Sequence, residues 1–273
     1  MRKACLLLVS LISLGGTAQA GQPIFNEMPR WSGGWGVQLL QEYRHEQSYY
    51  DGKQLLGADL YRTAHLLHVE GVYTWHRSIR ITTKVPVMLS AERRGLSETG
   101  EIVTHTKTAL GDPTIALPLK KYFNLDGRSG SWTVAPQLRI PGASASSDPI
   151  GIYFREFGLG LSLGYETETY DYIVRTGMSA FTFMEDTPTI YTLGATLGLN
   201  FSLGSRNGHL KWQQRLKYWD GIEFTYTMGP VVYLRWTDLL HFQVRSTHDV
   251  YEFRTGPVHG KAHTVRIGAG LVF

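Results

Sequence analysis

The chain has 273 residues, of which 42% are hydrophobic and 18% charged, a composition typical of folded proteins that excludes disordered and fibrous classes. It contains no stretch of 18 or more apolar residues, which argues against a bundle of membrane-spanning helices. The formal net charge is +4, and loss of Arg2 and Lys3 would leave 25 basic against 23 acidic residues. A net charge of that size is no footprint of nucleic-acid binding, so we expect no nucleic-acid partner.

Residues 1–20 have the pattern of a secretory signal peptide. A basic start precedes an apolar run from Ala4 to Leu14, and Ala18-Gln19-Ala20 is the small-x-small sequence that signal peptidase accepts. The run is too short to anchor the chain across a bilayer of about 30 Å. We predict cleavage after Ala20, which removes the single cysteine, Cys5, and leaves an exported chain without disulfides. Residues 21–33 are predicted to form a periplasmic N-terminal segment or a plug.

From residue 34 to residue 273 the dominant hydrophobic period is two, which is typical of β-strands with one apolar and one polar face. In the segment 78–89, for example, Ile79 and Ile81 share one face, while Arg80 and Lys84 share the other. Such runs have roughly the 9–11 residues that a tilted strand needs to cross a bilayer. About twelve strands are predicted, at 35–45, 61–74, 78–89, 110–123, 131–141, 155–166, 170–182, 189–202, 209–219, 222–236, 240–247 and 263–273.

Long and short connections alternate between these strands. The long ones are 46–60, 90–109, 142–154 and 248–262, and the short ones include 75–77, 167–168 and 237–239. Transmembrane barrels have short periplasmic turns, longer outer loops and, in single bacterial chains, an even number of strands. Both termini are therefore expected on the periplasmic side. The tight hairpin at Asp220-Gly221 is the exception among the outer connections.

The apolar faces decide the fold class. Nearly every predicted strand has one, and little sequence remains to cover a sheet of that size. A closed barrel solves the problem, because it turns these faces to lipid while every backbone group is paired. We therefore predict an all-β fold, a transmembrane antiparallel up-and-down β-barrel over 34–273 in the cell outer membrane, in contact with outer-membrane lipid and lipopolysaccharide. The alternating strand that ends at Phe273 resembles the C-terminal strand that such barrels present to the barrel-assembly machinery.

Aromatic side chains are expected at the two membrane interfaces, because amphipathic rings prefer that level. One assignment of strand faces puts two groups of rings outward. The predicted periplasmic girdle contains Tyr73, Phe123, Trp132, Tyr165, Tyr172, Phe201, Trp212, Trp236, Phe242 and Phe273. The predicted outer girdle contains Tyr43, Phe157, Tyr191, Tyr218 and Phe224.

The opposite faces give a predominantly basic lumen. The predicted solute pathway consists of Arg80, Lys84, Asp112, Lys120, Arg139, Arg175, Lys211, Arg215, Arg235, Arg245 and Arg266. Lys217 faces the same way, and Glu42, Glu70, Glu166 and Glu223 oppose these bases. A basic ring in a narrow conduit would favour anions. The alternative is that the charges pair and plug the interior, and twelve strands lie between filled eight-stranded barrels and open sixteen-stranded porins.

Six glycines are expected on the inner face of three consecutive strands. They are Gly158, Gly160, Gly164, Gly177, Gly194 and Gly198. Missing side chains there could leave a solute path, make room for a plug, or let the sheet bend, and the sequence leaves the three readings open.

Two neighbouring segments resemble a known family. Gly111-Asp112-Pro113 begins one predicted strand, and Leu138-Arg139-Ile140-Pro141 ends the next. The pair is similar to the outer-membrane proteins grouped as the phenol-degradation meta-pathway transporter family, and the strand rhythm agrees beyond residues 110–142. The resemblance implies a channel that admits aromatic or other small organic compounds, with Asp112 and Arg139 near its outer mouth.

An outer-membrane lipid hydrolase is the rival hypothesis. Ser246 and His248 share one face, with Asp249 next to them and His263 on the following strand, so a nucleophile, a base and an orienting group could meet. Known barrel lipases place histidine before serine, and the order here is reversed. No metal site or nucleotide motif is present, and no cofactor is expected.

The sequence thus predicts a channel, and not an enzyme, that passively admits a small-molecule solute, with anionic and aromatic compounds as the candidates. The alternatives are the lipid hydrolase and a plugged barrel with a structural or interaction role.

Overall fold

The computed structural model describes residues 33–51, 54–97, 100–125, 128–142, 156–184, 188–204, 206–221, 223–254 and 257–273. The predicted signal peptide and all but the last residue of the predicted N-terminal segment lie outside these ranges. No helix within them is long and apolar enough to cross a membrane. The strands are β1 (Gly34–Asp51), β2 (Gln54–His76), β3 (Ile79–Leu96), β4 (Ile102–Leu110), β5 (Thr114–Ala116), β6 (Leu119–Leu125), β7 (Arg128–Arg139), β8 (Gly158–Glu168), β9 (Tyr172–Phe183), β10 (Ile190–Leu203), β11 (Arg206–Trp219), β12 (Glu223–Arg235), β13 (Leu240–Arg254) and β14 (Pro257–Val272).

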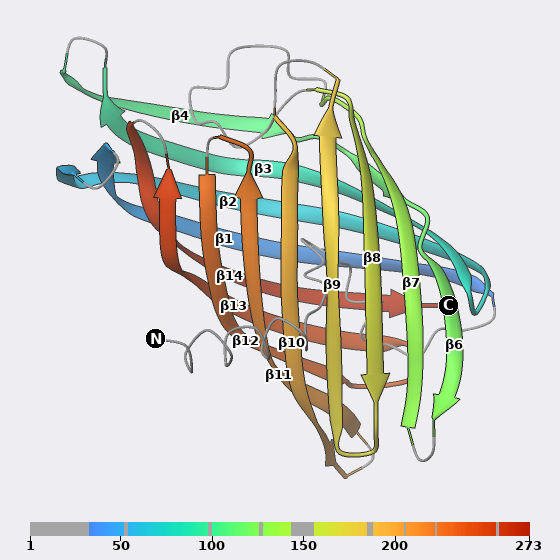
Figure 1. Cartoon of the computed structure of the whole chain (residues 1–273). Helices are drawn as coiled ribbons and strands as arrows, with labels where there is room; N and C mark the ends of the chain where they lie inside the picture. The colour runs from blue at the N-terminus through green and yellow to red at the C-terminus, as the bar shows by residue number, and fades with distance from the viewer. Residues whose placement is uncertain are drawn as a thin grey trace, which may run out of the picture.

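The sheet closes on itself through the first and last strands. β1 pairs along its length with β2 on one side and with β14 on the other (Figure 1). At the seam, the Trp35 N–H donates to the Phe273 carbonyl at 2.8 Å, and the Phe273 N–H donates back to Trp35 at 2.9 Å. Because β4, β5 and β6 share one passage between β3 and β7, the fourteen segments make twelve passages. The predicted antiparallel twelve-stranded barrel is confirmed.

The fourth passage was predicted to be a single strand, 110–123, but the structure divides it into three segments, β4, β5 and β6. It is interrupted at Gly111–Pro113 and again at Leu117–Pro118. Proline lacks an N–H and cannot donate to the ladder, which breaks regular pairing there. At each break one backbone hydrogen bond still joins the passage to a neighbouring strand. The Gly111 N–H donates to the Pro86 carbonyl of β3 at 2.8 Å, and the Leu117 N–H donates to the Pro136 carbonyl of β7 at 3.0 Å.

Three of the predicted long loops are wrong, because they are largely strand. β1 and β2 stay paired to Asp51 and Gln54, β3 and β4 stay paired to Leu96 and Ile102, and β13 and β14 continue almost to each other. These hairpins project at the end opposite the C-terminus (Figure 1). Polar residues interrupt the apolar alternation there, yet hydrogen-bonded pairing does not require an apolar face. The fourth long loop, 142–154, lies almost wholly outside the described residues. The turn predicted at 167–168 lies just beyond β8, at 169–171.

The burial pattern is inverted relative to a soluble protein. Gln38, Glu46 and Arg80 are fully buried inside the barrel, whereas Leu197 and Leu199 on the outer wall are each 62% exposed. Soluble proteins almost never bury charged side chains on this scale while exposing apolar ones. The outer wall is therefore a lipid-facing surface, as in outer-membrane barrels. Of the fifteen aromatic residues predicted to face outward, ten are exposed and five are half-buried, in agreement with the predicted orientation for the exposed ten.

A close backbone approach between β12 and β13 makes one glycine a sensitive position. A Cβ atom on Gly229 would lie 1.9 Å from the Ser246 carbonyl oxygen and 2.8 Å from the Thr247 Cα. We expect Gly229→Ala to lower the free energy of unfolding by about 1–3 kcal/mol, because the two strands must separate locally. Urea unfolding in detergent, followed by tryptophan fluorescence, measures the change. The control is Gly71→Ala, where the nearest atom is a single side-chain hydroxyl, and equal losses in the two variants would contradict the prediction.

Candidate solute pathway

None of the eleven residues of the predicted pathway is exposed. The structure does not bring them into one ring but distributes them along the interior. Lys120, Arg175 and Arg235 line a cavity at the end of the barrel where the short turns lie. Arg215, Arg245 and Arg266 line a second, narrower space formed by β1 and β11 to β14. The remaining ones are Arg80, Lys84 and Lys211 on the wall and Asp112 and Arg139 where the fourth passage meets the end of β7.

The turn-side cavity has a volume of about 560 Å³. Its bases are largely neutralised: the Glu166 carboxylate accepts a hydrogen bond from the Lys120 ammonium at 3.0 Å and is also paired with Arg175. Arg235 is paired with Asp238 at the adjacent turn. This part of the predicted basic lumen therefore follows the alternative in which charges pair across the interior.

A stack of three rings on β11, β12 and β13 lies at the same end and was not predicted. The centroid of the His209 ring lies 5.3 Å from that of Tyr233, and the centroid of Tyr233 lies 5.8 Å from that of His241. The Tyr233 hydroxyl is hydrogen-bonded to His241 Nδ1, and His209 Nδ1 lies 2.6 Å from Asn200 Oδ1. The signal that could have found the stack is face assignment, since each ring lies an even number of residues from a base predicted to face inward: His209 is two residues from Lys211, Tyr233 two from Arg235, and His241 four from Arg245.

The second space, which we call the arginine chamber, has a volume of about 80 Å³. Five cations, three carboxylates and four threonine hydroxyls line it, and no aromatic ring does. Its lining residues are Glu42, Arg44, Gln213, Arg215, Lys217, Glu223, Thr225, Thr227, Arg245, Thr247, Asp249, Ala262, Thr264 and Arg266.

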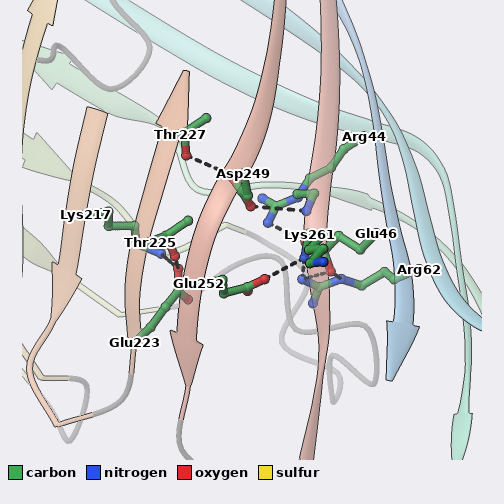
Figure 2. Close-up of polar contacts among 11 residues, drawn as sticks. Arg44, Glu46, Arg62, Lys217, Glu223, Thr225, Thr227, Asp249, Glu252 and Lys261 are labelled. Carbon is green, nitrogen blue, oxygen red and sulfur yellow. Dashed lines mark hydrogen bonds and ion pairs between the residues drawn. The ribbon is translucent and has the colours of Figure 1, made fainter. Parts of the chain in front are cut away.

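Two carboxylates at the end of the chamber away from the C-terminus, Glu46 and Glu223, are each paired with basic or hydroxyl side chains (Figure 2). Glu46 on β1 is paired with Arg44 and with Arg62 of β2. The Glu223 carboxylate on β12 accepts from the Lys217 ammonium at 3.1 Å and from the Thr225 hydroxyl at 2.5 Å. These pairs satisfy buried carboxylates that would otherwise be costly inside the barrel.

Asp249 and Glu252 on β13 hold the backbone and a hydroxyl nearby (Figure 2). Asp249 accepts from the Thr227 hydroxyl at 2.6 Å and from the Ala262 N–H at 3.2 Å. Glu252 accepts from the N–H of Lys261, at 2.5 Å, where the chain has a positive φ of 54°. The carboxylates at this end are therefore committed to structural contacts.

Two arginines of the chamber are not neutralised. Among the described residues, neither Arg215 nor Arg245 has a carboxylate within ion-pair distance, and the buried Arg245 Nε has no hydrogen-bond partner. Arg266 donates to Glu42 at 2.7 Å, and Glu42 is also 2.8 Å from His68. Arg245 stands directly opposite Arg266 across β13 and β14, an arrangement of like charges that destabilises a strand pair. The result is a local excess of positive charge that favours an anion.

The two segments that carry the family resemblance contact each other. The Gly142 N–H donates to the Asp112 carboxylate at 2.9 Å, and a Cβ on Gly142 would lie 2.7 Å from the Gly111 carbonyl oxygen. Asp112 thus ties the broken fourth passage to the end of the next strand. The Arg139 guanidinium lies over the Phe181 ring, 5.0 Å from its centroid.

Three of the six inward glycines do not leave open space. A Cβ on Gly158 or Gly160 would lie 2.2 or 2.4 Å from the Phe181 ring. A Cβ on Gly198 would lie 2.6 Å from the Lys211 Cγ. Side chains of Phe181 and Lys211 therefore occupy the volume at these three positions, which leaves neither a solute path nor room for a plug there.

The structure does not assemble the hydrolytic constellation. His248 is exposed on the outer wall, with its ring centroid 5.9 Å from that of His263, and Ser246 is half-buried. Asp249 is buried on the other side of the strand, where its two oxygens accept from Thr227 and Ala262. The orienting carboxylate and the base thus lie on opposite faces of the wall. No group of three or more metal-ligating side chains occurs in the described ranges.

Comparison with known proteins places this geometry among outer-membrane barrels. No family model and no curated protein matches the chain. Among solved structures, the COG4313 outer membrane channel from Pseudomonas putida F1 matches with a TM-score of 0.66 at 15% identity, covering 89% of this chain and 96% of that one. The KdgM porin matches with a TM-score of 0.49 at 12% identity, over 86% and 99% of the two chains. The chain has the fold of an outer-membrane β-barrel.

Glu42 is the acidic group on which the balance of the chamber depends. We expect Glu42→Gln to lower the free energy of unfolding by about 3–5 kcal/mol, because Arg266 would lose its carboxylate inside the barrel. Urea unfolding in detergent measures this. The matched control is Asp238→Asn, which breaks an exposed pair with Arg235 and is expected to cost less than about 1 kcal/mol. Similar small losses in both variants would show that Arg266 is satisfied without Glu42.

Proposed function

We propose that the protein is an outer-membrane channel for small polar solutes and that its lumen prefers anions. The observation that carries the proposal is the arginine chamber, in which Arg215 and Arg245 lack carboxylate partners within the described part of the chain. A fixed positive charge in a narrow passage with low-dielectric walls concentrates anions and repels cations.

The polar interior supports a passage for hydrophilic solutes. The lining of the chamber consists of charged, amide and hydroxyl side chains with one alanine, so an ion moving through it meets groups that replace its water. No aromatic ring lines this chamber. The proposal therefore includes no stacking site for aromatic solutes there, although the family resemblance implies such compounds.

The same features argue against an enzyme in the proposal. Ser246 and His248 sit on the outer wall without the carboxylate that would orient the base, and Asp249 is engaged inside the barrel. A plugged barrel with a structural role would share the fold but would pass no current. The two remaining readings are thus separated by conductance.

Planar-bilayer recording of the purified full-length mature protein tests the proposal. We expect current steps, and a reversal potential under a KCl gradient that shows preference for chloride. The double variant Arg215→Gln/Arg245→Gln should reduce that preference several-fold, because it removes the two uncompensated charges. Arg206→Gln is the matched control, since Arg206 stacks over Trp236 at the turn side, outside the chamber. Absence of current from folded protein, or preference for potassium, would refute the proposal.

A further inference from the structure

We propose that the arginine chamber is a saturable binding site for a small dicarboxylate, held between Arg215 on one side and the facing pair Arg245 and Arg266 on the other. This inference rests on the proposed channel function and names the solute class of the same site. It is argued from the position, charge and partners of the lining residues.

The first step is the separation of the cations. Arg245 and Arg266 are directly opposite each other on adjacent strands, whereas Arg215 lies on β11, two strands away from Arg245. Arg215 pairs with Thr227, which pairs with Asp249, so Arg215 is level with a residue four positions along β13 from Arg245. With strands about 4.8 Å apart and a rise of about 3.3 Å per residue, the backbones that carry the two arginines are separated by about 16 Å. Side chains that reach toward each other from such positions match two carboxylates joined by a short carbon chain better than one compact ion.

The second step is charge. Five cations and three carboxylates line the chamber, an excess of two positive charges. The three carboxylates are already engaged by Arg266, Lys217 and the Thr227 hydroxyl respectively. A doubly charged anion would neutralise the excess, and an arginine fork binds a carboxylate with two parallel hydrogen bonds.

The third step is the supply of further donors and the size of the space. Thr247 and Thr264 face each other two residue pairs beyond Arg245 and Arg266, on the same face of the sheet, and both line the chamber. Their hydroxyls can donate to a carboxylate or to a hydroxyl on the solute. The volume of about 80 Å³ admits a small solute that has shed most of its water, so contacts with the arginines must replace that water.

The fourth step is the electrostatic repulsion between Arg245 and Arg266, which lowers the stability of the fold. Arg245 faces Arg266 without a carboxylate of its own, and its Nε is buried without a partner. A residue that served only the fold would not be held in a position where it repels its neighbour. We therefore expect Arg245→Gln to leave the urea midpoint unchanged or to raise it, which a structural role for Arg245 would not allow.

The site lies inside the barrel, so the ligand is a dissolved solute and not a lipid phosphate. Chloride current through single channels is recorded while succinate, acetate or sulfate is added at constant ionic strength. We expect succinate to reduce the current and to reach half-block at a concentration about tenfold lower than acetate, because a second charge-assisted contact contributes on the order of that factor. Sulfate should be weaker than succinate, because it cannot span the two positions.

Variants identify the residues. Arg215→Gln and Arg245→Gln should each remove the difference between succinate and acetate, and Arg245→Lys should keep part of it, since lysine retains the charge but not the fork. Arg206→Gln should behave as wild type. Folding of every variant is checked by the change in its electrophoretic mobility between unheated and heated samples. If a glutamine variant does not fold, Arg245→Lys still tests the site.

The outcomes separate this inference from the function on which it rests. A wild-type protein that passes no current refutes the channel. A wild-type protein that prefers chloride, but in which succinate, acetate and sulfate reduce the current equally, keeps the channel and overturns the dicarboxylate site. A preference for succinate that survives in both glutamine variants would also overturn it.

Discussion

The structure depends on one constraint: in hydrocarbon, every backbone N–H and carbonyl must find its partner within the protein. The seam between β1 and β14 meets this constraint, because it removes the two edges that a twelve-passage sheet would otherwise expose. Closure then fixes the side chains, since alternate residues of a strand point to opposite faces. Apolar residues such as Leu197 and Ile267 reach lipid, and polar ones such as Gln38 and Glu70 are forced inside. The charged interior is therefore a direct consequence of closing the sheet.

Enclosing so many charges in a narrow barrel creates a second problem, because each buried charge needs a partner or water. Several buried carboxylates solve it by pairing with bases: Glu46 with Arg44 of its own strand and Arg62 of the next, Glu166 with Lys120 and Arg175, and Glu223 with Lys217. Within the part of the chain that the structure describes, the basic residues at the turn side are neutralised by carboxylates, whereas two arginines of the arginine chamber are not. Charge pairing and a basic passage therefore occur in different parts of the same barrel.

Face assignment from the sequence predicted the barrel, its passage count and the inward position of the basic residues, because a period of two survives in every membrane-crossing strand. It did not predict which bases are neutralised. That depends on register, for example on Arg266 lying opposite Glu42 while Arg245 lies opposite Arg266. It also missed Arg62 and Glu46 as a pair, because Glu46 falls in the segment 46–60, which was predicted to be a loop. The breaks at Pro113 and Pro118 were visible in the sequence, but their repair by Pro86 and Pro136 carbonyls required the fold.

Some cations of the chamber have carboxylate partners among the described residues and others do not, and this difference indicates that the unpaired ones bind a ligand. If positive charge were present only because the inner face must be polar, serine, threonine or glutamine would serve as well and at lower cost, as Gln213 and Thr247 do in the same lining. Instead the sheet holds Arg245 against Arg266 and leaves Arg215 without a carboxylate, although acids are available at neighbouring positions and are used elsewhere. A fold tends to tolerate such local repulsion where it serves recognition of a ligand. The repulsion between these arginines is relieved when an anion lies between them, so binding and conduction draw on the same uncompensated charge.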